Sequence, residues 1–154
     1  MKSKSKLIIT LILFFGICFY FVLPVEVEGV VERKAIHGEM SGNTGEMVLE
    51  NLQYPGMPWI FVENKDFEQF FSPEDKNVYV NDSMKELLER KYIGVNYYVA
   101  IHVSSDDPVN DVPEGEAFTY FVSLEDFNKV KIGDEITYKV SRYRFARIDR
   151  ITVL

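Results

Sequence analysis

An uninterrupted apolar run near the N-terminus sets the first limit on how this chain can fold. Residues Leu7 to Leu23 (LIITLILFFGICFYFVL) include no charged side chain. A helix of this length extends about 25 Å, slightly less than the roughly 30 Å of a hydrocarbon core, so flanking residues complete the crossing. Pro24 follows directly and cannot continue the helix. We therefore predict a transmembrane anchor over residues 7–23.

The charges before this run predict its orientation. Lys2, Lys4 and Lys6 precede it, and basic residues next to a span favour the cytoplasmic side. Residues 1–6 are thus predicted to be a cytoplasmic basic tail, and residues 24–154 an extracytoplasmic domain. Because no second apolar stretch approaches the roughly 18 residues of a span, we expect a single-pass signal-anchor protein of the cell membrane that contacts lipid through its apolar run.

Two other interpretations of this run stay open. A cleaved signal peptide also begins with basic residues, but its apolar stretch is about 7 to 15 residues and ends at a small-residue cleavage site. Residues 24–29 (PVEVEG) contain no such site. A lipid anchor would require small residues before Cys18, which follows Gly16-Ile17 and precedes bulky aromatic residues. The leading prediction is an uncleaved anchor in which Cys18 is an apolar residue of the span.

Length and charge limit the outer domain and its partners. The 154 residues allow one ordinary domain and a short extra segment. Once the three leading lysines are set aside, residues 24–154 carry 14 basic and 24 acidic residues, a formal charge of −10. Phosphate backbones are bound through clustered Lys and Arg, so nucleic acid is not an expected partner. The arginines at 142, 144, 147 and 150 are interpreted as the solvent face of a strand or, alternatively, a docking patch for an acidic partner.

Strand patterns dominate the outer domain. Five runs are rich in β-branched and aromatic residues, and several alternate apolar with polar side chains: 25–36, 97–103, 117–122, 134–141 and 145–153. Ser123 and Asp126 have the S-x-x-[DE] spacing of a helix start, so residues 124–129 are predicted to form a helical turn.

Three strands, a helical turn and two further strands, in this order, resemble an OB-type barrel. The residues that carry the resemblance are VEVEGVV, YYVAIHV, AFTYFVSLEDFNKVKIGDEITYKV and FARIDRITV. It implies a mainly β (α+β) fold, in which the N-terminal transmembrane helix precedes an OB-like five-stranded small β-barrel with residues 38–94 as an insertion. A different mixed α+β barrel is the rival fold.

The insertion carries one predicted helix. Ser83 and Glu86 have capping-box spacing, and Gly94 suits the position after a helix end. We predict a helix over 83–92. Its expected buried residues are Met84, Leu87 and Leu88. The remaining predictions for this part are a loop or wide hairpin turn at 37–46 and short strands at 47–52, 60–63 and 78–80.

Catalytic signatures are absent from the sequence. There is no G-x-S-x-G, H-E-x-x-H, P-loop or G-x-G-x-x-G pattern. His37 and His102 are the outer domain's only histidines. His102 is interpreted as a surface or hydrogen-bonded core residue and His37 as an exposed residue at the start of a glycine-rich loop, although the pair could bind a metal together with a carboxylate. We therefore expect no enzyme activity, no catalytic residue and no cofactor.

An acidic loop and an aromatic segment are the candidate binding regions. Loop 104–116 is interpreted as a solvated loop with no assigned metal site; calcium binding is the alternative, because hard cations prefer carboxylate oxygens. The weak calcium candidates are Asp106, Asp107, Asp111 and Glu114. Segment 54–71 is aromatic, and its rings either cap a barrel or contact a ligand or partner. The candidate contacts there are Tyr54, Trp59 and Phe70.

These features predict a non-enzymatic, membrane-tethered extracytoplasmic domain with an interaction or accessory role. Its expected partner is another membrane or extracytoplasmic protein. The alternative is a small-ligand or cation-binding sensor domain that uses the acidic loop 104–116 or the aromatic segment 54–71.

Overall fold

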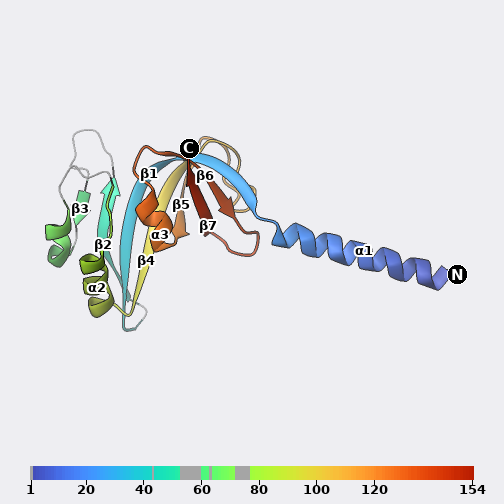
Figure 1. Cartoon of the computed structure of the whole chain (residues 1–154), viewed down its shortest axis with the longest axis horizontal. Helices are drawn as coiled ribbons and strands as arrows, with labels where there is room; N and C mark the ends of the chain where they lie inside the picture. The colour runs from blue at the N-terminus through green and yellow to red at the C-terminus, as the bar shows by residue number, and fades with distance from the viewer. Residues whose placement is uncertain (1, 43, 53–59, 63, 72–76) are drawn as a thin grey trace.

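The computed structural model describes every residue except 1, 43, 53–59, 63 and 72–76 (Figure 1). An N-terminal helix, α1 (Lys2–Val22), projects away from a sheet domain. The domain contains β1 (Val25–Met40), β2 (Thr44–Leu52), β3 (Ile60–Val62), a 3-10 helix η1 (Lys65–Phe70), α2 (Asp82–Lys91), β4 (Gly94–Val103), β5 (Ala117–Val122), α3 (Leu124–Lys129), β6 (Glu135–Val140) and β7 (Ile148–Val153).

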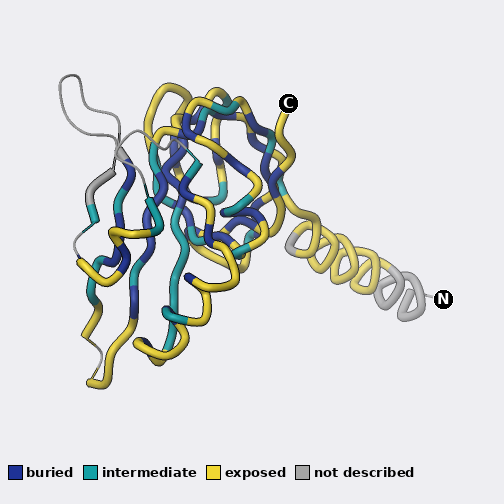
Figure 2. The backbone as a smooth tube through the Cα atoms, turned by 60° about the vertical axis from the view of Figure 1, so that its left-hand side comes forward, coloured by how far each residue is buried: buried dark blue, intermediate teal, exposed yellow. Residues whose placement is uncertain are grey.

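The described apolar side chains of α1 are exposed, and Figure 2 shows the helix as an exposed segment beside a partly buried domain. Within the part of the chain that the structure describes, no helix has both the length and the apolar character that a membrane crossing requires. The transmembrane anchor over residues 7–23 therefore stays a prediction.

The strands form one antiparallel sheet of seven strands, with β1 at its centre. One edge of β1 pairs with β4. Its other edge pairs first with β6, over residues 25–30, and then with β2, over residues 33–40. The mainly β class is thus confirmed, but the expected five-stranded barrel is wrong because the sheet is open. β7 pairs with β6 and not with β5, and Phe121 of β5 forms an isolated bridge with Arg147, the residue before β7.

The hairpin between β1 and β2 corrects the loop predicted at 37–46. β1 continues to Met40 and β2 begins at Thr44, so only residues 41–43 separate them. Glycine at position 38 does not interrupt the strand, because β2 and β4 bond to it on both sides. A Cβ built on Gly38 would lie 2.3 Å from the Tyr92 ring, so the missing side chain leaves the space in which Tyr92 packs.

The helices agree closely with prediction, with one correction. α2 begins at Asp82 rather than Ser83, and its N-cap is Asn81, whose side chain accepts from the Met84 N–H. Met84 and Leu88 are buried, as predicted, and Leu87 is half-buried. α3 matches the predicted turn, and its Ser123 cap accepts from the Asp126 N–H.

The short strands of the insertion were predicted with mixed success. β2 includes the strand predicted at 47–52, and β3 confirms the described part of the strand predicted at 60–63, whereas residues 78–80 are irregular. Val78 has a φ of 43°, a left-handed conformation that a β-branched residue rarely adopts and that is incompatible with a strand.

Candidate binding groove

The outer face of β1, β4 and β5 carries a row of aromatic side chains. Alternation along β4 and β5 places Val99, Ile101 and Tyr120 in the core, so Tyr98 and Phe121 lie on the opposite face. These two residues are register partners, and their ring centroids are 4.5 Å apart. The ring of His37, on β1, lies 4.9 Å from that of Tyr98. Three neighbouring strands thus present a half-buried aromatic surface.

An open groove of about 650 Å³ lies over this surface. Its residues come from the ends of β1 and β4, from β5 and from the 141–147 turn between β6 and β7: Glu39, Asn96, Tyr98, Phe121, Arg144, Phe145 and Arg147. A second hollow of about 370 Å³ continues past His37 toward the β1–β2 hairpin and shares Glu39, Asn96 and Tyr98 with the first. The two hollows are therefore adjacent.

The turn that forms one wall of the groove is fixed to the sheet by its backbone. The Phe121 N–H donates to the Ala146 carbonyl at 2.8 Å. The Ala146 N–H donates to Oδ1 of the buried Asn110 at 2.7 Å. Ala146 has a φ of 53°, so these bonds hold a conformation that is uncommon for a residue with a Cβ.

Asp107 connects this turn to the core. Its side chain is fully buried. Oδ2 accepts from the Asn110 amide at 2.7 Å and from the Tyr120 hydroxyl at 2.7 Å, and the Tyr138 hydroxyl lies 3.0 Å from that of Tyr120. Oδ1 accepts from the backbone N–H groups of Val109 and Asn110. A buried carboxylate therefore orders both the 104–116 loop and, through Asn110, the groove wall.

The buried tyrosines of this network predict a loss of stability in alkali. Burial raises the pKa of Tyr120 and of Tyr138 well above the usual 10, and the hydrogen bond to Asp107 raises that of Tyr120 further. The stability that these two hydroxyls contribute is fully present well below pH 10, because each tyrosine is then protonated in both the folded and the unfolded protein. Above pH 10 the unfolded chain ionises first, so the free energy of unfolding should fall by up to about 1.4 kcal/mol per pH unit for each tyrosine.

Urea unfolding between about pH 9 and pH 11 measures this slope. The Tyr138→Phe variant should show a shallower decline than the wild type, because one raised pKa has been removed. A wild-type unfolding free energy that stays constant over this range would contradict the burial of these hydroxyls.

The charges along the groove are unevenly paired. Glu39 accepts from the Asn96 amide at 2.6 Å at one end. At the other end Arg144 lies 3.5 Å from Asp149. Arg147 is exposed, and no ion pair to it occurs among the residues that the structure describes. The groove therefore offers an available cation beside an aromatic floor, a combination suited to binding rather than to proton transfer.

The candidate calcium ligands do not converge. Asp107 is committed to the buried network, and Oδ1 of the exposed Asp106 accepts from the Glu114 N–H at 2.9 Å. Asp111 and Glu114 are exposed, and Asp111 has a φ of 57°. Among the described residues there is no group of three or more His, Cys, Asp or Glu that could hold a metal ion.

The two histidines lie apart on the sheet. His37 is opposite Asn96, whereas His102 is opposite Val30, near the other end of β4. Nδ1 of the exposed His102 lies 3.1 Å from Glu32. They do not form the shared metal site considered from the sequence.

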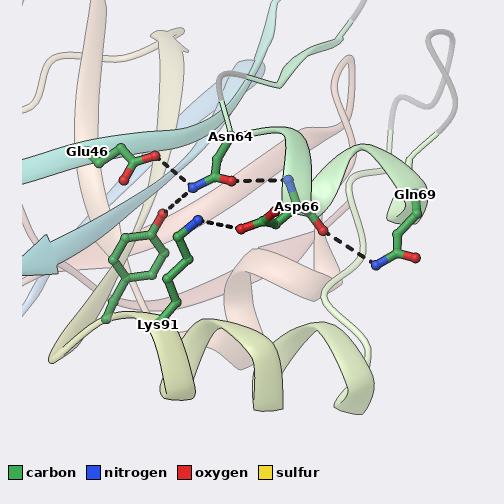
Figure 3. A network of polar contacts seen from close by, with 6 residues as sticks. Glu46, Asn64, Asp66, Gln69 and Lys91 are labelled. Atoms are coloured by element: carbon green, nitrogen blue, oxygen red, sulfur yellow. Dashed lines mark hydrogen bonds and ion pairs between the residues drawn. The ribbon is translucent and has the colours of Figure 1, made fainter.

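The aromatic segment 54–71 contributes one described candidate. Phe70 is half-buried and packs against the core, and Phe67 is fully buried; Tyr54 and Trp59 lie outside the described residues. Figure 3 shows how this segment is held: the Asn64 amide donates to Glu46 at 2.7 Å and to the Tyr92 hydroxyl at 3.0 Å. Lys91 donates to Asp66 at 2.6 Å. The described part of the segment thus packs against β2 and α2.

Tyr98 and Phe121 were not identified as site residues from the sequence, whereas Arg144 and Arg147 belong to the arginine group that the sequence offered as a docking patch for an acidic partner. Tyr98 and Phe121 belong to runs that were predicted as strands, but the sequence does not show which residues lie opposite each other. Only the register places their rings together, and only the 141–147 turn adds Arg147. Aromatic residues at strand positions that alternate with core residues were the available signal.

No family model matches this chain, and no curated protein or solved structure matches it. A functional proposal therefore depends on its own residues.

Proposed function

We propose that this protein is a non-enzymatic, single-pass membrane protein whose extracytoplasmic β-domain binds another extracytoplasmic or membrane protein through the groove on β1, β4 and β5. The observation that carries the proposal is the half-buried aromatic surface of Tyr98 and Phe121 beside the exposed Arg147. An ordered surface that combines apolar contact area with an available cation can bind a partner and needs no reactive group to do so.

The tether is supported by the uncharged run of residues 7–23 and by the exposure of α1. The exposed fractions of Leu13, Phe14, Phe15 and Phe19 lie between 58% and 66%. A continuous apolar surface of this kind on a soluble protein indicates contact with lipid or with another protein. Three leading lysines favour a cytoplasmic N-terminus, which places the groove outside.

An OB-like arrangement is supported by the order of strand pairing. β1, β4 and β5 form a meander, α3 follows, and the β6–β7 hairpin returns to pair with the start of β1. The bridge between Phe121 and Arg147 lies where a closed barrel would continue. OB-folds bind ligands on the face of their second and third strands, beside the first and fourth connections. Here β4, β5 and the 141–147 turn occupy these places, and residues 38–94 form the insertion.

The partner's chemistry follows from the groove. Arg147 fits a carboxylate, and Tyr98 and Phe121 fit an aromatic or apolar side chain. We expect the occupant to be a protein segment that carries an acidic residue next to an apolar one. The formal charge of −10 on residues 24–154 disfavours nucleic acid.

Photo-crosslinking in native membranes tests this binding site. A benzophenone amino acid at Phe121 should give a discrete protein adduct, and the same group at Tyr79, an exposed residue outside the groove, should not. Arg147→Glu should reduce the Phe121 adduct at least tenfold, because it reverses the charge that meets the partner's carboxylate. Arg90→Glu, on the exposed face of α2, should leave it unchanged.

Equal adduct yields at positions 121 and 79 would contradict a groove partner. An adduct that is unaffected by Arg147→Glu would contradict an acidic partner segment.

A further inference from the structure

The turn between β6 and β7 has a composition unlike the rest of the domain. Residues 142–145 read RYRF, which alternates basic and aromatic side chains. Tyr143 is 64% exposed and Phe145 is 74% exposed. The two arginines belong to a domain whose formal charge is −10.

This turn lies at the end of α1. The Arg142 guanidinium donates to the Tyr20 carbonyl at 3.1 Å and to the Leu23 carbonyl at 2.7 Å. It also lies 4.2 Å from the centroid of the Tyr20 ring. Figure 1 shows the turn on the side of the domain from which α1 departs. The turn is therefore next to the position at which the chain would leave the bilayer.

We propose that the RYRF turn docks on anionic lipid headgroups at the membrane surface and so fixes the orientation of the domain, an inference that rests on the proposed membrane tether. Aromatic residues with a polar tip favour the interface, and arginines near an anionic surface are attracted to its phosphates. The remainder of the acidic domain is repelled by the same surface. Attraction at one turn and repulsion elsewhere select a single orientation.

Docking of this turn directs the groove outward. Arg144 and Phe145 line the groove at the end near α1, whereas Glu39 and Asn96 line its other end. Those two residues lie near the β1–β2 hairpin, because Glu39 is close to the end of β1 that is far from α1 and Asn96 is opposite His37. In the docked domain, the groove extends away from the lipid surface, and its far end is accessible to a partner outside the membrane.

Spin-label accessibility on the full chain tests this docking. In a Cys18→Ser background, a nitroxide is attached through Tyr143→Cys or, as the matched control, through Ile93→Cys. Ile93 is 76% exposed and follows α2, away from the turn. Each protein is reconstituted into vesicles of phosphatidylcholine with or without phosphatidylglycerol. Flotation reports membrane association, and collision with oxygen relative to a water-soluble nickel chelate reports lipid contact.

With phosphatidylglycerol, the label at position 143 should show a several-fold higher oxygen-to-nickel ratio than the label at 93. Arg144→Gln should reduce the docked-to-undocked ratio on the order of fivefold, as should omission of the anionic lipid. Arg150→Gln, on the exposed face of β7, should have less effect.

The outcomes separate the docking from the tether. A chain that floats but gives equal ratios at 143 and 93 retains its tether and contradicts the docking. The same ratio with and without phosphatidylglycerol contradicts recognition of anionic headgroups. A chain that does not float contradicts the tether, and the docking with it.

Discussion

The Asp107→Ala variant should lose about 3–5 kcal/mol of unfolding free energy, the largest loss expected from any acidic residue of the 104–116 loop. The substitution leaves the Tyr120 hydroxyl, the Asn110 amide and two backbone N–H groups without their acceptor. Buried donors without a partner each cost about 1–3 kcal/mol. Denaturant unfolding of the full chain in detergent, followed by circular dichroism, measures the loss.

Asp106→Ala is the matched control. Asp106 is exposed and accepts one backbone bond, so its loss should stay below about 1 kcal/mol. Asp107→Asn, which retains one acceptor oxygen, should fall between the two and provides a measurement if the alanine variant does not fold. Similar losses for Asp106→Ala and Asp107→Ala would show that Asp107 does not organise the loop.

Lys34→Ala should destabilise the domain by a similar amount, about 3–5 kcal/mol. Lys34 is fully buried on β1. Its ammonium donates to the carbonyls of Asn77, Val78 and Val130 and lies 4.2 Å from the centroid of the Phe127 ring. Alanine would remove these bonds, leave a cavity and free the strained Val78 backbone. Unfolding in urea, monitored as for Asp107, gives the magnitude.

One substitution separates the charge of Lys34 from its bulk, and a second serves as the exposed control. Lys34→Met keeps the volume of the stem and should cost less than Lys34→Ala. Lys139→Ala removes an exposed lysine that lies 3.5 Å from Glu26, and should cost less than about 1 kcal/mol. If Lys34→Ala were as mild as Lys139→Ala, the bonds from Lys34 would not be holding the 77–80 segment.

The strands of the C-terminal half were predictable because their patterns are local. Residues 97–103 and 117–122 alternate or are rich in β-formers, and they fall within β4 and β5. The Ser123 cap likewise marks the start of α3. Each of these elements depends on residues close to it in the sequence, so its periodicity or capping pattern can be recognised from the sequence alone.

The groove and the buried polar groups depend on distant contacts. Asp107 belongs to a charge-rich loop of the kind that is usually solvated, and it is buried beside Tyr120, whose hydroxyl donates to it and also contacts the Tyr138 hydroxyl on another strand. Lys34 sits in a charged stretch, ERK, and its burial follows from carbonyls 43 to 96 residues away. Neither environment leaves a local pattern in the sequence.

Cysteine accessibility in intact cells tests most directly whether the domain lies outside a membrane that the N-terminal run anchors. In a Cys18→Ser background, a membrane-impermeant maleimide should label the Ile93→Cys variant at once. It should label the Ser3→Cys variant only after the membrane is permeabilised. Labelling of Ser3→Cys with protection of Ile93→Cys, or a mature chain that begins after residue 23, would contradict the proposed placement.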